Sequence, residues 1–362
     1  MVIKMNTLPT RKEVIRRFKE KGGQVAAVLP IHYPRELLRA FGLLPVEVWG
    51  PPNADVSLGG SHLQSYTCAI VRNAISFLLS GGLEATDVIL VPHTCDSLQG
   101  MGSVLLDFVK PRQKVLTLYH PRGTRQTHFD FLVEELKRLY KELADWSGKR
   151  PSEAELEQAI LREESADEAL AQLYSVRWKL NLSDREFYTL VRSREFLPAE
   201  EFTRHLARLT RGEEKRPTGI PILLSGVVPE PMLLFDEIQA MGARVVADDL
   251  ACGTRRLYQP GTANEPFARM AERLLSGPPD PTRGSSIAER TAHLKRLIAD
   301  SGAKGVLIYD PKFCEPELFD VPLIRKKMEA EDIPVTYVEF DMGEPLPQQT
   351  LTRIEAFVEM IG

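Results

Sequence analysis

The stretch Asp87-Val-Ile-Leu-Val-Pro-His-Thr-Cys-Asp96 decides the fold expected for this chain. Its four consecutive apolar residues, Val88 to Val91, predict a short strand that is buried on both faces, as in a parallel sheet. Pro92 is expected to end the strand, because proline lacks the amide proton that a sheet uses. Cys95 follows three residues later. It is therefore expected near the carboxyl end of the strand, where open α/β sheets bind their ligands.

Strands and helices alternate on both sides of this stretch. Strands are expected at 24–29, 46–49, 88–91, 115–118, 220–225, 243–247, 306–309 and 335–338. The helices expected outside the middle of the chain are 10–21, 35–41, 66–80, 102–108, 231–241, 265–275, 286–300, 315–330 and 348–361. Between about 127 and 211 only three to five helices are expected, and the polar run 211–217 is typical of a linker.

This alternation predicts an α/β fold with two doubly wound (Rossmann- or flavodoxin-like) parallel-sheet domains and a helical insert. The expected parts are an N-terminal α/β domain (1–126) with Cys68 and Cys95, a helical segment (127–216), and a C-terminal α/β domain (217–362) with Cys314.

Composition excludes several classes of protein. The chain has 362 residues, 43% hydrophobic and 27% charged, with 46 Lys and Arg against 50 Asp and Glu. The net charge of −4 argues against a protein that binds nucleic acid through bulk charge. No apolar run is long enough to span a membrane, and the N-terminus runs into a charged stretch without the features of a secretory signal. We therefore expect a cytoplasmic protein.

The four cysteines include no C-x-x-C pair, so the fold itself must assemble any metal site. Cys68 opens a predicted helix, where the helix dipole stabilises a thiolate, while Cys95 and Cys314 follow strands in different domains. Our hypothesis is that these three cysteines meet at one iron–sulfur cluster, since thiolates favour such clusters, zinc or copper(I). Cys252 is a weaker candidate for a fourth ligand.

Two alternatives remain open at this point. Each cysteine taken singly is more often a small buried apolar residue than a ligand. A zinc ion held by the three cysteines and one histidine is the competing metal site, and the histidine would be His62, His93 or His32.

Several segments together resemble the subunits of the 2-hydroxyacyl-CoA dehydratase and benzoyl-CoA reductase family. The resemblance runs from about residue 24 to 340. It rests on Pro34-Arg-Glu-Leu-Leu-Arg-Ala-Phe-Gly42 with Leu44-Pro45, Ser65-Tyr-Thr-Cys68 with Arg72, Val91-Pro-His-Thr-Cys95-Asp96, Asp248-Asp-Leu with Gly253-Thr-Arg255, and Lys312-Phe-Cys314-Glu-Pro316.

The resemblance implies a [4Fe-4S] cluster, or half of a double-cubane cluster, held by Cys68, Cys95 and Cys314. It also implies a dimer of homologous subunits and a separate ATP-hydrolysing iron–sulfur activator that supplies a low-potential electron. In the dehydratases of this family the electron generates a ketyl radical on an acyl-CoA, which expels the hydroxyl at the β position. In the reductases the electrons enter an aromatic thioester.

The chain departs from the common family pattern around Cys68. Thr67 and Ala69 flank this cysteine, where a proline often follows, and only 27 residues separate it from Cys95. These departures leave room for a second subfamily, the homodimeric double-cubane cluster reductases of small molecules.

Five further residues are candidates for the site. His32 and Glu36 follow the first strand and are expected near the open iron as a hydrogen-bond donor or proton carrier, in the catalytic role. Arg72, with Arg122 and Arg125 of the loop after strand 115–118, is expected to bind the anionic parts of a substrate. The simpler interpretations are a loop histidine, a carboxylate at a helix start, an ion pair and an ordinary surface loop.

Three functions are compatible with these features. The first is a redox enzyme subunit, either a radical-type acyl-CoA dehydratase (a lyase) or an ATP-dependent reductase component. The second is an electron carrier or accessory protein of the same fold. The third is a zinc-containing or metal-free ligand-binding protein with the architecture of periplasmic binders.

Overall fold

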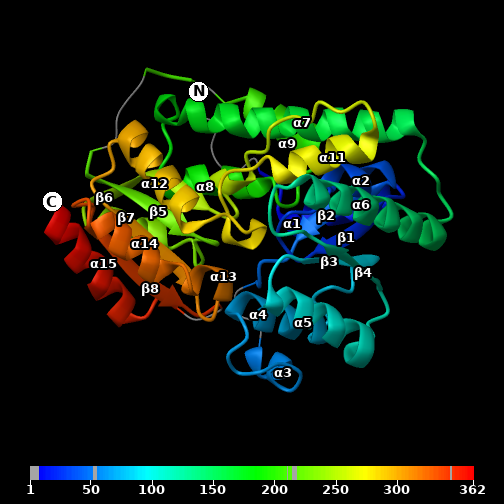
Figure 1. The fold of residues 1–362 in the computed structure, drawn as a ribbon, viewed down its shortest axis with the longest axis horizontal. Coiled ribbons are helices and arrows are strands. Elements are labelled where there is room, and N and C mark those ends of the chain that lie inside the picture. The colour runs from blue at the N-terminus through cyan, green and yellow to red at the C-terminus, as the bar shows by residue number, and fades with distance from the viewer. Residues whose placement is uncertain (1–7, 52–54, 210, 214–217, 343–344) are drawn as a thin grey trace.

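The computed structural model describes residues 8–51, 55–209, 211–213, 218–342 and 345–362. It confirms the predicted α/β fold, with two four-stranded parallel sheets flanked by helices (Figure 1). No helix in this described part of the chain is both long and apolar enough to cross a membrane.

The first sheet has the strand order β2-β1-β3-β4. Its strands are β1 (Gln24–Val28), β2 (Leu43–Glu47), β3 (Val88–His93) and β4 (Lys114–Tyr119). The order reverses direction between β1 and β3. At such a switch point the loops leaving the two strands diverge and open a crevice for a ligand.

Side chains alternate between the two faces of this sheet, as the period of a strand requires. One face, including Ala26 and Leu90, packs on a helical layer, and the other face, including Ala27 and Ile89, packs on the remaining helices. The helical layer is formed by α2 (Arg35–Ala40), α6 (Gln126–Ser147), α7 (Glu153–Ser175) and α11 (Pro266–Leu275). The opposite side carries α1 (Arg11–Glu20), α4 (Ala69–Leu79) and α5 (Asp96–Val104), the last continued by η2 (Leu105–Val109), while α3 (Val56–Gly60) packs on α4.

The segment between the sheets is helical, as predicted. After α6 and α7 come η3 (Arg177–Lys179), α8 (Asp184–Ser193) and α9 (Ala199–Ala207). The domain boundaries at 126 and 216 stay a prediction. Helix α11 follows the second sheet's β6 in sequence, yet it packs against α6 and α7 over the first sheet (Figure 1).

The second sheet repeats the topology of the first, with the order β6-β5-β7-β8. Its strands are β5 (Ile220–Gly226), β6 (Ala243–Leu250), β7 (Val306–Pro311) and β8 (Val335–Phe340). Helices α12 (Ile287–Ser301) and α14 (Val321–Glu329) cover one face, and α8, α10 (Leu234–Ala240) and α15 (Gln348–Ile361) lie on the other. Short elements complete this half: η4 (Thr254–Arg256), η5 (Pro281–Arg283) and α13 (Glu315–Leu318).

Four boundaries differ from those predicted, and proline explains three of them. Strand β3 continues through Pro92, because β1 pairs with β3 only as far as Leu90 and loses no hydrogen bond there. Pro45 is tolerated in β2 because β2 is an edge strand, so this strand begins at Leu43. The helix expected at 315–330 is two helices, since Pro322 lies in the first turn of the second. Strand β6 extends beyond 247 to Leu250.

Candidate functional site

Three cysteines occupy the same local position, the residue that caps the start of a helix. Cys68 precedes α4, Cys95 precedes α5 and Cys314 precedes α13. Cys95 and Cys314 come directly after β3 and β7, which hold equivalent places in the two sheets. The amide of Ala69 donates a hydrogen bond to the carbonyl of Lys312 (3.0 Å), which ties the start of α4 to the loop after β7. The repeated topology thus brings cysteines from both halves of the chain together.

All three cysteines line one cavity, here called the three-cysteine cavity, of about 60 Å³. One water molecule needs roughly 10–15 Å³, so the cavity has room for more than one. Its other walls are apolar for the most part. The polar residues among them are Thr94, Arg255, Asp280, Thr282 and Glu317.

The environments of the three thiols differ. The Cys314 thiol donates a hydrogen bond to Cys68, and with the amides of Ile70 and Val71 it lowers the pKa of Cys68. The same contact raises the pKa of Cys314, and burial adds to that effect. Burial raises the pKa of Cys95 to about 12, against the amides at the start of α5. One thiolate is therefore stabilised by the protein alone, whereas the others need a cation, since metal binding deprotonates a thiol outright.

This donor set fits an iron–sulfur cluster. Soft thiolates are the ligands of such clusters, and three of them line an apolar cavity at helix starts that favour negative charge. A search of the described residues for three or more Cys, His, Asp or Glu side chains grouped around a single metal ion finds none. In a cubane each cysteine binds a different iron, so the ligands need not converge on one point.

Cys252 lies apart from the other three. It is 1% exposed in the hydrophobic core and is not among the cavity residues. Burial raises the pKa of its thiol. The neighbouring turn uses its own polar groups: Asp248 accepts hydrogen bonds from the amides of Leu250 (3.2 Å) and Thr254 (2.9 Å), and Asp249 pairs with Arg255 (2.8 Å). The polar-ligand turn considered for this segment is thus occupied by internal bonds.

His32 lies buried beside the three-cysteine cavity. Its Nδ1 is 2.9 Å from the hydroxyl of Tyr258, and its Nε2 is 3.5 Å from Oδ1 of the cavity residue Asp280. Burial lowers the pKa of His32. Of the other histidines considered for zinc, His93 faces the ring of Tyr119 (centroids 4.5 Å apart), and His62 lines a separate open groove.

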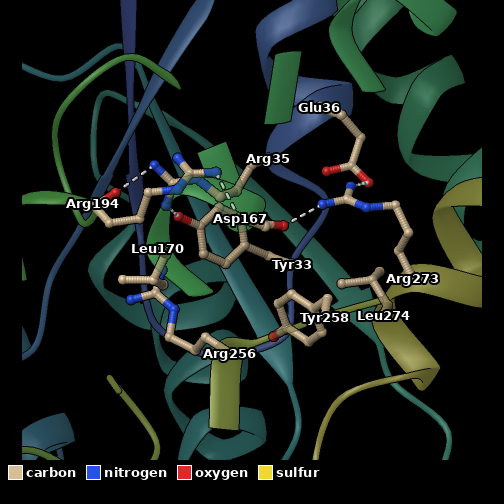
Figure 2. Close-up of a pocket in the computed structure, with 10 residues that line it drawn as sticks. All are labelled: Tyr33, Arg35, Glu36, Asp167, Leu170, Arg194, Arg256, Tyr258, Arg273 and Leu274. Carbon is tan, nitrogen blue, oxygen red and sulfur yellow. Dashed lines mark hydrogen bonds and ion pairs between the residues drawn. The ribbon is translucent and has the colours of Figure 1, made fainter. Parts of the chain in front are cut away.

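Glu36 points into a different pocket, drawn in Figure 2 and here called the charged pocket. Its Oε1 is 2.6 Å from Nη1 of Arg273, and burial raises its pKa. The charged pocket is lined by Tyr33, Arg35, Glu36, Asp167, Leu170, Arg194, Arg256, Tyr258, Arg273 and Leu274 and has a volume of only about 20 Å³. Glu36 is not among the residues that line the three-cysteine cavity.

The three candidate arginines lie nearer the surface. Arg72 pairs with Asp341 (3.2 Å) and lies over the ring of Phe313. Arg122 is exposed, and its nearest carboxylate is that of Asp96 at 3.9 Å. Arg125 is exposed at the start of α6.

Comparison with known proteins places this architecture. The model of the family "2-hydroxyglutaryl-CoA dehydratase, D-component" matches residues 30–361. The chain belongs to this family. It is similar to the (R)-phenyllactyl-CoA dehydratase beta subunit of Clostridium sporogenes (24% identity, 97% of this chain and 95% of the relative). It is also similar to the (R)-2-hydroxyglutaryl-CoA dehydratase beta subunit of Acidaminococcus fermentans (23%, 97% and 96%) and to a benzoyl-CoA reductase subunit of Thauera aromatica (25%, 94% and 92%).

In this dehydratase-family chain, sequence reasoning missed the polar wall of the cavity. Asp280 and Thr282 belong to the loop between α11 and η5, Arg255 to the turn after β6, and Glu317 to α13. The one local signal was the segment Pro278-Pro-Asp-Pro-Thr282, where a single acid stands among prolines. That pattern predicts a rigid turn and does not reveal that the turn reaches a site built by both sheets.

Proposed function

We propose that this chain is the iron–sulfur subunit of a 2-hydroxyacyl-CoA dehydratase or benzoyl-CoA reductase type of enzyme, with Cys68, Cys95 and Cys314 as ligands of a [4Fe-4S] cluster. The observation that carries the proposal is the meeting of three cysteines, from both halves of the chain, at one apolar cavity. When bound, the cluster would supply low-potential electrons at an iron that no cysteine occupies.

The protein's own residues have three tasks in this proposal. The helix starts at Cys68 and Cys95 direct amide groups at the sulfurs and stabilise their thiolate forms. Apolar side chains such as Ile70 and Leu98 keep bulk water from the cavity, which protects a reactive substrate. His32, beside the cavity, is the proton carrier, and Arg72, Arg122 and Arg125 attract the anionic part of an acyl-CoA.

Glu36 is a less direct candidate for catalysis than His32, because it faces the charged pocket and pairs with Arg273. We keep it in the proposal as a residue that acts through the charged pocket. Tyr258 connects the two places, since it lines the charged pocket and contacts His32.

The proposed partners are a homologous second subunit, or a second copy of this chain, and an ATP-hydrolysing iron–sulfur activator. The relatives are themselves named as subunits, which supports a multi-subunit enzyme. Exposed aromatic residues beside the cysteines also support a partner: Tyr66 is 67% and Phe319 68% exposed, and both line an open groove of about 520 Å³. The enzyme would work in the cytoplasm.

A reductase is the second candidate, because the benzoyl-CoA reductase relative matches at an identity similar to that of the dehydratases. It includes the homodimeric double-cubane cluster reductases, to which the flanks and spacing of Cys68 point. An electron carrier of the same fold would hold the cluster without transforming a substrate.

Anaerobic purification tests these proposals. We expect brown protein with stoichiometric iron and sulfide, whose visible absorption is bleached by reductant. Turnover of 2-hydroxyacyl-CoA or aromatic acyl-CoA esters, with an ATP-driven activator and candidate partner subunits, then separates dehydratase, reductase and carrier. Colourless protein with stoichiometric zinc would contradict the cluster, and a cluster-loaded protein inactive on every thioester would favour the carrier.

A further inference from the structure

A buried pair of titratable groups lies between the two pockets. Asp280 is 0% and His32 2% exposed, and Oδ1 of Asp280 is 3.5 Å from Nε2 of His32. The same carboxylate oxygen accepts hydrogen bonds from the amide of Thr282 (2.8 Å) and from its hydroxyl. The prolines on both sides of Asp280 and these bonds hold the carboxylate in place.

The pair has one end in each pocket. On one side Asp280 lines the three-cysteine cavity, and its Oδ2 accepts no hydrogen bond from the described residues. On the other side Nδ1 of His32 is 2.9 Å from the hydroxyl of Tyr258, which lines the charged pocket. Tyr258 is labelled among the residues of that pocket in Figure 2. A continuous series of polar groups therefore runs from the charged pocket to the cavity.

The charges around the pair keep it ready to transfer a proton. Oδ2 of Asp280 is 3.5 Å from Nη1 of Arg255, and Arg283 also acts on Asp280. Although burial opposes ionisation, His32 and these two arginines lower the pKa of Asp280. His32 is faced in addition by Arg256 and by His120, whose ring centroid is 5.4 Å away. Burial first, and then the cations, lower the pKa of His32, so that its imidazolium is a stronger acid than in water.

We propose that His32 and Asp280 deliver a proton from the charged pocket to the three-cysteine cavity, where dehydration of an acyl thioester consumes it. This inference rests on the proposed function. When the bond between carbon and hydroxyl breaks, the oxygen leaves with the electron pair as hydroxide and needs one proton to become water. The Nε2–H bond of the His32 imidazolium breaks as an O–H bond forms at Asp280. That O–H bond then breaks as the proton passes to the hydroxide, which restores the carboxylate.

The test compares Asp280→Asn and His32→Gln with the wild type and with Asp236→Asn. Asp236 is a matched control, because it is a half-exposed aspartate on α10 whose partner is the surface residue Arg185. Iron content is measured for all four proteins. The ¹⁵N shifts of His32 are measured in cluster-free protein labelled on histidine, and the signal is assigned by its loss in His32→Gln.

We expect full iron in all four proteins and a wild-type His32 whose neutral form carries its proton on Nε2. Asp280→Asn should change that tautomer or its pKa, and turnover should fall by about 10²–10⁴-fold, as when a general acid is lost. Tyr258→Phe, which keeps the ring, should lower turnover less and serves if Asp280→Asn does not fold.

An Asp280→Asn protein with full iron, an unchanged His32 signal and wild-type turnover would overturn this inference alone. If Asp280→Asn does not fold, Tyr258→Phe and His32→Gln proteins with full iron and wild-type turnover would overturn it equally. Wild-type protein that binds no iron would overturn the proposed function, and this inference with it.

Discussion

The two pockets of this molecule are both buried, yet they treat polar groups in opposite ways. In the charged pocket, arginines face carboxylates at close range: Arg273 reaches Glu36 (2.6 Å) and Asp167 (2.5 Å), and Arg194 reaches Asp167 (3.1 Å) (Figure 2). In the three-cysteine cavity, Oδ2 of Asp280 and the hydroxyl of Thr94 have no hydrogen-bond partner among the described residues.

The difference separates stability from function. Buried charges that are paired hold elements together, and here they join the first strands, the helical segment and α11. Buried polar atoms without a partner carry a desolvation cost that folding alone does not explain, and such atoms concentrate at ligand sites. Substitutions in the charged pocket should therefore change stability, whereas substitutions in the cavity should change what the protein binds.

The largest effect on stability is expected at Glu47, a fully buried carboxylate on β2 that joins two arginines of the charged pocket. It pairs with Arg35 (2.8 Å) and Arg256 and accepts hydrogen bonds from Tyr33 and Trp49. Glu47→Ala should lower the free energy of unfolding by about 3–5 kcal/mol, because it leaves buried cations unpaired. Urea denaturation measures the change.

The control for Glu47 is Glu20→Ala, which removes an exposed pair with Arg16 and should cost less than about 1 kcal/mol. Equal losses in the two variants would show that the buried pairs are not the main support of this region.

The next largest effect is a pH dependence from Glu163 on α7. Although burial opposes ionisation, Arg194 and Arg35 lower its pKa to about 2 from the ordinary 4.5. A lowered carboxyl pKa stabilises the fold fully above pH 4.5, and this stability is lost as the pH falls from 4.5 toward 2. The loss is roughly 3 kcal/mol. Glu163→Gln should remove this part of the acid dependence in unfolding curves measured at a series of pH values, and an unchanged slope would contradict the assignment.

A smaller effect is expected for Cys252→Ala. The side chain is buried outside the cavity, so its truncation should cost about 1 kcal/mol of stability through lost packing. Thermal unfolding measures the loss. Iron content should not change, and a loss of iron in this variant would make Cys252 a ligand after all.

The smallest effect is expected for Thr94→Val in cluster-free protein. The Thr94 hydroxyl is buried without a hydrogen-bond partner in the described part of the chain, so its removal should change stability by about 0.5 kcal/mol or less, in either direction. A loss above about 2 kcal/mol in a denaturation curve would mean that the hydroxyl is bonded within the protein and is not free to serve the cavity.

Much of the fold was predictable because alternating strands and helices are local patterns. Short apolar runs such as Val88–Val91 marked the central strands, and cysteines after two of them were expected at the ligand-binding edge of a sheet. That Cys68, Cys95 and Cys314 line one cavity follows from this topology, while their role as ligands stays a prediction.

The remaining features of the site depend on contacts that no local pattern encodes. Glu36 was expected near the cysteines, but its direction is set by Arg273, which lies on a helix 237 residues away in sequence. Asp280 reaches the cavity only because α11 packs over the first sheet and returns the chain to the second. Cys252 also follows a strand, but it follows edge strand β6, away from the switch point.

Iron and sulfide content of anaerobically prepared Cys314→Ala and Cys252→Ala proteins tests the central claim most directly, because both changes remove one cysteine from the same half of the chain. The account predicts that Cys314→Ala loses most of its iron and sulfide while Cys252→Ala keeps the wild-type amount. Wild-type loading in Cys314→Ala, or equal loss in both variants, would contradict a cluster held at the three-cysteine cavity.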